Sequence, residues 1–267
     1  MKWFDIDDYI NDFRNINIII GGRGIGKTYS ALNFLITSGE AFIYLRNKDN
    51  QLDESCSDFG NPFKRLNKDL NRNVTMNKSK KHAFIYEDDR LLGYGAALST
   101  FESLRGVDLS DVKYVIFDEF IEKGKLMFNQ FEAFVNFYET VNRNRELLGE
   151  DALKVFMLSN SQSLNNEILM GYNLVPIIEG MVRSGQRKYK NENLCLLLPE
   201  SEISDLKRQT GQYKLIAGTK IYKEVIENKF AHDSYYGINR LPHTYQRKQN
   251  YSRQGGLARF GIDKRTY

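Results

Sequence analysis

Residues that can bind phosphate lie close together near the start of this 267-residue chain. Positions 21–28 are occupied by Gly21, Gly22, Arg23, Gly24, Ile25, Gly26, Lys27 and Thr28, in the order Gly-x-x-x-x-Gly-Lys-Thr. Glycines at these positions let the backbone turn tightly and aim successive N–H groups inward. Lys27 can then reach the β- and γ-phosphates, and the Thr28 hydroxyl can bind Mg²⁺. The pattern predicts a phosphate-binding loop for a magnesium nucleotide.

The residues on either side of the loop help to decide whether it binds phosphate. The alternative is a glycine-rich turn before a helix, with no ligand. The loop follows an apolar run at residues 16–20 and precedes residues 28–39, where Ala31, Leu32 and Leu35 have helical spacing. A helix that begins at the loop directs its positive end at the same phosphates. This context favours the phosphate-binding loop.

Two adjacent acids, Asp118 and Glu119, follow a second apolar run at residues 114–117. Four apolar residues in a row are typical of a central strand in a parallel sheet, and ligands bind at the carboxyl edge of such sheets. We therefore expect Asp118 to position Mg²⁺ with Thr28, and Glu119 to polarise the attacking water. The alternative for Glu119 is an acid that supports the magnesium site without activating water.

A further strand, expected at residues 153–158, ends in Ser159 and Asn160, and Asn160 could sense the γ-phosphate. Nucleotide hydrolysis needs phosphates held in line, neutralised charge and an aimed water molecule, and the residue types present fit these tasks. No Asn-Lys-x-Asp sequence for binding guanine occurs, and no arginine-rich lid is obvious. A GTPase and a nucleotide kinase are therefore disfavoured.

Apolar periodicity predicts the elements that must position these residues. Strands are expected at 41–45, at 74–77, 83–86 and 91–98 as a meander, and at 177–182 and 194–198; helices are expected at 3–13, 63–70, 99–102 and 128–145. Arg46 follows one of the strands, where it would face phosphate, a neighbouring subunit or solvent. Together these elements predict an α/β fold, with a mostly parallel sheet flanked by helices.

Composition limits the class of protein. The net charge is +4, from 38 basic and 34 acidic residues, and basic residues gather at 64–81 and 240–267. Such runs can bind nucleic acid, although a charged run is more often a solvated surface. Cys56 and Cys195 are too few for a disulfide framework, and neither a signal sequence nor a long apolar segment occurs. We expect a soluble, intracellular protein.

Four motifs in order, GGRGIGKT, VIFDEFI, NRNRE and LSN, together resemble the DNA-packaging ATPases of small tailed phages, whose motor is a ring assembled on a prohead RNA. The resemblance covers most of residues 16–230. It implies a P-loop NTPase of the ASCE type that binds ATP and Mg²⁺. It also implies a homomeric ring, pentameric on the procapsid, that moves double-stranded DNA through the portal in the cytoplasm of an infected bacterium.

The resemblance further implies basic residues that act in trans on the ATP of a neighbouring subunit. Arg143 is the matching position, with Arg145 beside it, and Arg105 matches a second basic position upstream of the acidic strand. The alternative for these residues is an ordinary salt bridge at the surface.

Members of the family also carry a linker and then a vestigial nuclease-like domain, and roughly seventy residues after Pro199 are too few for both. We therefore expect an ATPase domain at residues 1–198 and a linker or partial C-terminal region at 199–267. Two other functions stay open: another ring ATPase on nucleic acid, such as a helicase or translocase, and a scaffold whose nucleotide site controls assembly without sustained turnover.

Overall fold

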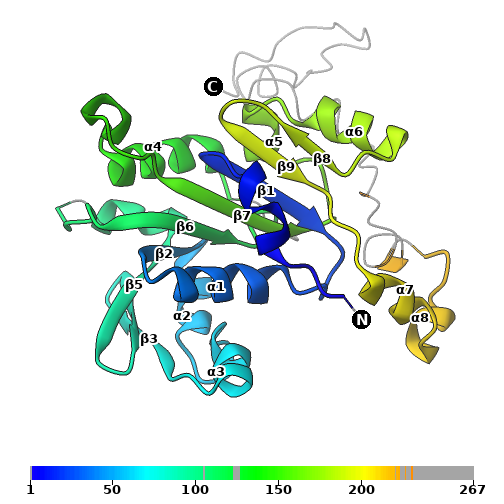
Figure 1. Cartoon of the computed structure of the whole chain (residues 1–267), viewed down its shortest axis with the longest axis horizontal. Coiled ribbons are helices and arrows are strands. Elements are labelled where there is room, and N and C mark those ends of the chain that lie inside the picture. The colour runs from blue at the N-terminus through cyan, green and yellow to red at the C-terminus, as the bar shows by residue number, and fades with distance from the viewer. Residues whose placement is uncertain are drawn as a thin grey trace, which may run out of the picture.

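The computed structural model describes residues 2–104, 106–122 and 127–219, together with residues 221, 222, 226 and 230. Its strands are β1 (Ile16–Gly21), β2 (Ala41–Arg46), β3 (Val74–Ser79), β4 (His82–Glu87), β5 (Arg90–Ala97), β6 (Val112–Asp118), β7 (Lys154–Asn160), β8 (Lys188–Lys190) and β9 (Leu194–Leu197). They form one sheet in the order β3-β4-β5-β2-β6-β7-β1-β9-β8 (Figure 1). The six adjacent strands β5, β2, β6, β7, β1 and β9 are parallel to one another. At the two ends of the sheet, β3 and β4 and, on the other side, β8 pair antiparallel with their neighbours.

Helices cover both faces of this sheet (Figure 1). The α-helices are α1 (Lys27–Ser38), α2 (Asp49–Ser55), α3 (Lys64–Leu70), α4 (Gln130–Asn142), α5 (Glu167–Gly171), α6 (Val175–Ser184), α7 (Glu202–Arg208) and α8 (Gly211–Leu215). Three short 3₁₀ helices are η1 (Ile6–Asp12), η2 (Leu98–Leu104) and η3 (Arg145–Leu148).

Alternation along the central strands divides the core into two layers, because successive strand residues point to opposite faces. Ile18 and Ile20 of β1 pack in one cluster with buried residues of α4, α5 and α6. Ile19, between them, belongs to a second cluster with residues of η1, α1, α2 and α3. Both faces of β1 are therefore buried, which explains its continuous apolar run.

The strand order brings three strand ends to one edge. β7 lies between β1 and β6, and the register places Gly21 opposite Asn160 and Asp118 opposite Leu158. Because these strands are parallel, the end of β1, where the glycine-rich loop begins, meets the end of β6 at Asp118 and the end of β7 at Asn160. All three lie at the carboxyl edge of the sheet. The additional strand between β1 and β6 is the feature expected of an ASCE-type sheet.

Several predicted elements differ from the structure. Residues 177–182 belong to α6 instead of a strand, because Val175, Ile178 and Met181 are buried at a helical spacing of three and Pro176 lies in the first turn, where it needs no hydrogen-bond donor. The segment predicted as a helix at 3–13 contains only the 3₁₀ helix η1, with Ile10 half exposed.

The helix predicted at 128–145 is shorter, and its buried face is rotated. Helical spacing in that run predicts one buried face that includes Phe128, Phe134, Val135 and Val141. Phe134 and Val141 are buried in the structure, but Phe128 and Val135 are exposed and Phe137 is buried instead. The helix α2 lies within residues 47–73, a polar stretch for which the sequence predicts only the helix at 63–70. Its buried side is short, so its apolar periodicity is weak.

Candidate active site

The phosphate-binding loop connects the end of β1 to the start of α1. Gly24 and Gly26 have φ angles of +68° and +101°, a backbone conformation that glycine adopts without steric cost. Lys27 is buried, and its Nζ donates hydrogen bonds to the carbonyl oxygens of Gly21 (3.0 Å) and Gly22 (2.8 Å) and to Oδ1 of Asn160 (3.2 Å). Lys27 therefore links the loop to Asn160 at the end of β7.

Burial lowers the pKa of Lys27 to about 8, although the negative charges of Asp118 and Glu119 oppose that shift. The ammonium group is bonded mainly to neutral oxygens of its own chain. Phosphate oxygens carry the negative charge that these neutral acceptors lack, and charge-assisted hydrogen bonds are the stronger ones. Lys27 is thus placed to exchange these partners for an anion.

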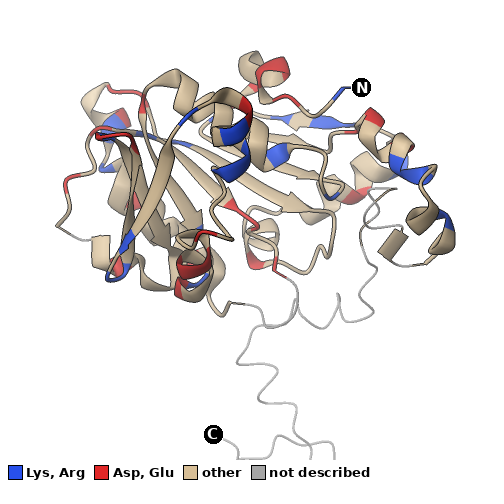
Figure 2. Cartoon of the chain, turned by 90° about the horizontal axis from the view of Figure 1, so that it is seen from below, with Lys and Arg blue, Asp and Glu red and all other residues tan. Residues whose placement is uncertain are grey.

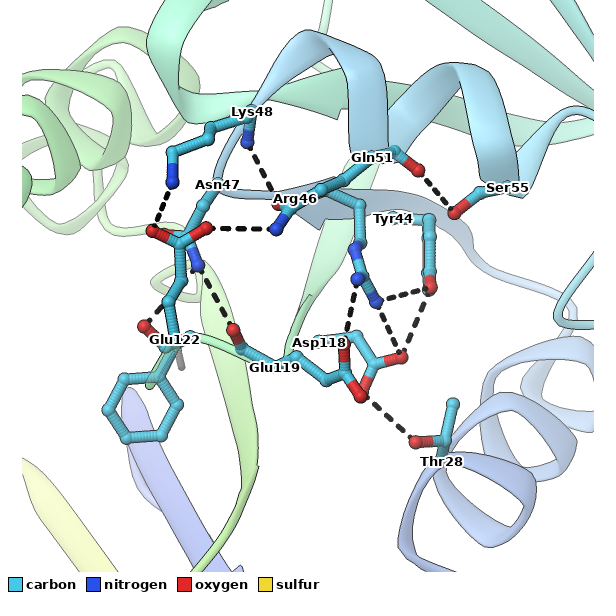
Figure 3. Close-up of polar contacts among 11 residues, drawn as sticks. Thr28, Tyr44, Arg46, Asn47, Lys48, Gln51, Ser55, Asp118, Glu119 and Glu122 are labelled. Carbon is cyan, nitrogen blue, oxygen red and sulfur yellow. Dashed lines mark hydrogen bonds and ion pairs between the residues drawn. The ribbon is translucent and has the colours of Figure 1, made fainter. Parts of the chain in front are cut away.

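Asp118 connects the loop to the acidic strand (Figure 3). Its Oδ1 accepts a hydrogen bond from the Thr28 hydroxyl at 3.0 Å, and its Oδ2 accepts one from the Tyr44 hydroxyl at 3.1 Å. Burial raises the pKa of Asp118, whereas the positive charge of Arg46 lowers it. A hydroxyl and a carboxylate this close fit Mg²⁺, which prefers hard oxygen ligands and keeps several waters.

Arg46 binds both acids. Its Nη1 lies 3.4 Å from Oδ2 of Asp118 and its Nη2 lies 2.9 Å from Oε2 of Glu119 (Figure 3). The Arg46 side chain is 13% exposed, and burial opposes its charge, but Tyr44 and the two carboxylates raise its pKa overall. The sequence offered phosphate, a neighbouring subunit or solvent as partners for Arg46. The structure instead places it on the acid pair of its own chain.

The backbone at Glu119 is held in an unusual conformation. Its φ of +52° is left-handed, which costs about 1 kcal/mol or more for a residue with a side chain. Nδ2 of Asn47 donates to the Glu119 carbonyl at 3.0 Å, and buried Gln130 donates to the Phe120 carbonyl and to Oδ1 of Asn47, both at 2.6 Å. Asn166 bonds to Gln130 in turn at 2.8 Å. This buried network fixes the direction of the exposed Glu119 carboxylate.

Sequence reasoning missed these amides because a single Asn or Gln carries no spacing signal. The residues it did predict for the loop, the acid pair and the third strand end line one cleft of about 270 Å³. The cleft is lined by Arg23, Gly24, Gly26, Lys27, Thr28, Tyr29, Asp118, Glu119, Leu158, Ser159 and Asn160. Gly21 and Gly22 bond to Lys27 beside it, and Ile25 is buried beneath the loop.

A larger cavity, of about 470 Å³, lies between residues 2–9 and α7 and touches the loop at Gly22. Five acidic residues line it, Asp5, Asp8, Glu200, Glu202 and Asp205, against the basic residues Lys2 and Arg208. Acidic walls repel phosphate, so the smaller cleft fits the predicted chemistry better despite its size.

Two of the three predicted arginines, Arg143 and Arg145, lie at the opposite edge of the sheet. Arg143 caps α4, is about half exposed, and donates through Nη2 to the Val107 carbonyl at 2.8 Å. Arg145 is only 3% exposed and donates to the carbonyl groups of Leu109 and Ser110, in the loop before β6, and of Val112, the first residue of β6. This placement gives Arg145 a structural role, so we do not retain it as a trans-acting residue. Arg105 lies outside the described residues.

The basic run at 64–81 is partly neutralised by acidic residues of α2, α3 and β4. Arg65 pairs with Asp69 and Arg72 with Glu87. Lys78 lies 2.7 Å from both Asp49 and Asp53 of α2. Segments with Lys and Arg alternate with segments with Asp and Glu along the described part of the chain (Figure 2). The second basic run, 240–267, lies outside the described residues. Within the described part of the chain, no helix is long and apolar enough to span a membrane.

Comparison with known proteins identifies relatives of this chain. Residues 2–247 match the model of the podovirus DNA encapsidation protein (Gp16) family. The chain is 29% identical over 235 residues to the DNA packaging protein of Bacillus phage PZA, and 29% identical over 229 residues to that of Bacillus phage phi29. These matches cover 85% and 83% of this chain but 65% and 64% of the relatives, so the chain spans just under two thirds of their length.

The fold is also similar to a solved structure. The N-terminal domain of the DNA packaging ATPase from bacteriophage phi29 matches with a TM-score of 0.60 and 27% identity, over 74% of this chain and 97% of that domain. This similarity confirms the ASCE-type P-loop fold predicted from the motifs. The family match extends over most of the chain and confirms the resemblance on which the trans-acting residues were predicted. The chain therefore belongs to the podovirus DNA encapsidation protein (Gp16) family.

Proposed function

We propose that this protein is an ATP-hydrolysing motor subunit that translocates double-stranded viral DNA into a procapsid. The observation that carries the proposal is the 3.0 Å contact between the Thr28 hydroxyl and Asp118, which brings the phosphate-binding loop and the acidic strand to one site. The relatives named DNA packaging proteins, and the packaging ATPase domain of phage phi29, support the substrate and the task.

Each residue of the cleft has one task in this proposal. The amides of the loop and Lys27 hold the β- and γ-phosphates, and Thr28 and Asp118 hold Mg²⁺. The ion would neutralise charge on the phosphates as the terminal group transfers. Glu119 orients and polarises the attacking water, and Asn160, bonded to Lys27, senses the γ-phosphate.

Arg46 and the amide network position Glu119 for that task. The ion pair of 2.9 Å and the left-handed backbone leave the Glu119 carboxylate few orientations, while 56% of its side chain stays exposed to the cleft and solvent. A fixed orientation lowers the entropy cost of aiming a water molecule at phosphorus.

Arg143 would complete the site of a neighbouring subunit. It lies beside the loop before β6, whereas Asp118 ends that strand six residues after Val112, roughly 20 Å away at the rise of a β-strand. That separation keeps Arg143 away from the nucleotide site of its own chain, so the role proposed for it is one across a subunit boundary. Arg105 stays a second candidate for this role.

The partners and organisation follow from the same proposal. We propose a homomeric ring, pentameric on the procapsid, that contacts double-stranded DNA, a portal protein and a prohead RNA at the portal vertex in the host cytoplasm. Residues 1–198 would form the ATPase domain, since β9 ends at Leu197, and residues 199–267 would form a linker or partial C-terminal region.

The test is the rate of phosphate release with ATP and Mg²⁺, measured with and without duplex DNA. We expect turnover that duplex DNA stimulates. Lys27→Ala should abolish it, because that variant removes the positive charge that binds the phosphates. Strand displacement would instead identify a helicase. Tight ATP binding without sustained turnover, with or without DNA, would identify a nucleotide-controlled scaffold and contradict the motor.

A further inference from the structure

A lysine from beyond the sheet contacts the phosphate-binding loop. Lys207, on α7, donates through Nζ to the carbonyl oxygen of Arg23 and lies 3.4 Å from that of Gly24. A Cβ atom built at Gly24 would lie only 3.0 Å from the same Nζ. The lysine therefore packs directly on the turn of the loop that borders the 270 Å³ cleft.

The helix that carries Lys207 is fastened to the chain's first residues. Ser201 caps α7 by accepting from the Ile203 amide, and its hydroxyl donates to the Lys2 carbonyl at 3.1 Å. The Glu202 carboxylate accepts from the Lys2 amide at 2.8 Å, and Ile203 is buried. Figure 1 shows α7 below the carboxyl edge, close to the N-terminus. The contacts with Lys2 therefore hold α7 in place where Lys207 reaches the loop.

The charge of Lys207 lacks compensation. Among the described residues no carboxylate lies within ion-pair distance of it. Burial lowers the pKa of Lys207, and the positive charge of Arg23 lowers it further. Lys207 in turn depresses the pKa of Lys27. Two cations of the loop, Arg23 and Lys27, therefore lie near a third from α7, Lys207, where the loop amides favour anions, and a bound polyphosphate would relieve their mutual repulsion.

We infer that Lys207 is a third cation of the nucleotide-phosphate site, and that through it nucleotide binding is coupled to the docking of α7 on the loop. The inference rests on the proposed function, because it needs a polyphosphate in the loop. Coupling of this kind is reciprocal: if a docked Lys207 strengthens nucleotide binding, then the nucleotide strengthens docking by the same factor. The segment that leaves the ATPase domain would then respond to nucleotide directly.

The first test is nucleotide affinity, measured by calorimetry on the full chain with Mg²⁺. Lys207→Gln keeps a hydrogen-bond donor but removes the charge, so ATP and ADP should bind roughly 5-fold or more weakly. AMP, which lacks the phosphates that the loop holds, should bind unchanged, and Lys207→Arg should restore affinity. The matched control is Lys214→Gln on α8, where the lysine is exposed. An equal loss for AMP, or no difference from the control, would overturn the inference.

The second test is hydrogen exchange of the α7 amides. If Lys207 had only a structural role, its substitution would not change the effect of ATP on this exchange. ATP should slow exchange at residues 201–208 in the wild type and in Lys214→Gln, but not in Lys207→Gln. Equal slowing in Lys207→Gln would contradict the coupling. If Lys27→Ala no longer binds ATP while Lys207→Gln binds it with wild-type affinity, the role of Lys207 is wrong but the proposed function stands. If the wild-type chain binds no ATP, the proposed function fails as well.

Discussion

The two edges of the sheet use their basic residues in opposite ways. At the carboxyl edge, Lys27 bonds to two loop carbonyls and Asn160, and burial lowers its pKa to about 8. At the amino edge, Arg145 is as deeply buried, but its guanidinium donates to three carbonyl groups at residues 109–112. The compact ammonium can exchange its neutral partners for phosphate, whereas the planar guanidinium is matched to its own chain. Lys27 is therefore placed to bind a ligand, whereas Arg145 stabilises the fold.

Arg143 offers the largest test of this comparison, because it lies at the structural edge yet is half exposed. An arginine that reaches a neighbour's γ-phosphate is typically worth about 10³-fold or more in turnover. In assembled rings, Arg143→Ala should therefore be nearly inactive while it binds ATP normally.

Mixing subunits makes this test specific. Arg143→Ala keeps an intact ATP site, and Glu119→Gln keeps an intact Arg143, so mixed rings should recover hydrolysis at the interfaces where the two intact residues meet. Phosphate release by the mixture should exceed that of either parent. If mixed rings form but stay inactive, or if Arg143→Ala rings hydrolyse ATP at the wild-type rate, both edges would act only within their own chain.

Glu119→Gln tests the carboxyl edge itself, with a smaller expected effect. Loss of a positioned base typically lowers turnover by about 10²-fold or more, whereas the loop and Lys27 should still bind ATP with nearly unchanged affinity. Parallel measurement of phosphate release and ATP affinity separates the two. A matched fall in affinity, in a folded protein, would make Glu119 a support for the magnesium site instead of the residue that activates water.

Arg145→Ala should change stability and leave the chemistry intact. The substitution leaves three carbonyl groups without their charged donor, and hydrogen bonds to charged groups contribute about 1.5–3 kcal/mol in net terms, so the free energy of unfolding should fall by about 2–3 kcal/mol. Urea unfolding measures this, with Arg143→Ala as the matched control that loses less than about 1 kcal/mol. Equal unfolding midpoints for Arg145→Ala and the wild type would remove the structural role.

The parts of the molecule that the sequence predicted share one property, which is a strong local signal. Three strands, β1, β6 and β7, are each buried on both faces and end in a change to glycine or polar residues. The placement of these strand ends at one edge follows from parallel pairing. The buried strands needed no tertiary information, because both layers of the core demand apolar residues there.

The parts that sequence reasoning missed depend on contacts between distant segments. Arg46 meets the acid pair 72 and 73 residues later, and Lys207 meets the loop 184 residues earlier. Gln130 is buried beneath Glu119 although nothing in its neighbours distinguishes it from a surface amide. Residues 177–182 were assigned to a strand because a short apolar run has no decisive period, and the helical spacing became clear only over the whole of α6.

The structure of the chain with Mg²⁺ and a non-hydrolysable ATP analogue would show whether the carboxyl edge binds the nucleotide. We expect the β- and γ-phosphates inside the loop, with Lys27 turned from the Gly21 and Gly22 carbonyls onto phosphate oxygens. We also expect Mg²⁺ to be held by Thr28 and Asp118. Nucleotide bound elsewhere, for example in the cavity lined by Trp3 and Asp205, with Lys27 still bonded to the two carbonyls, would contradict the claim that the carboxyl edge is the site of ATP hydrolysis.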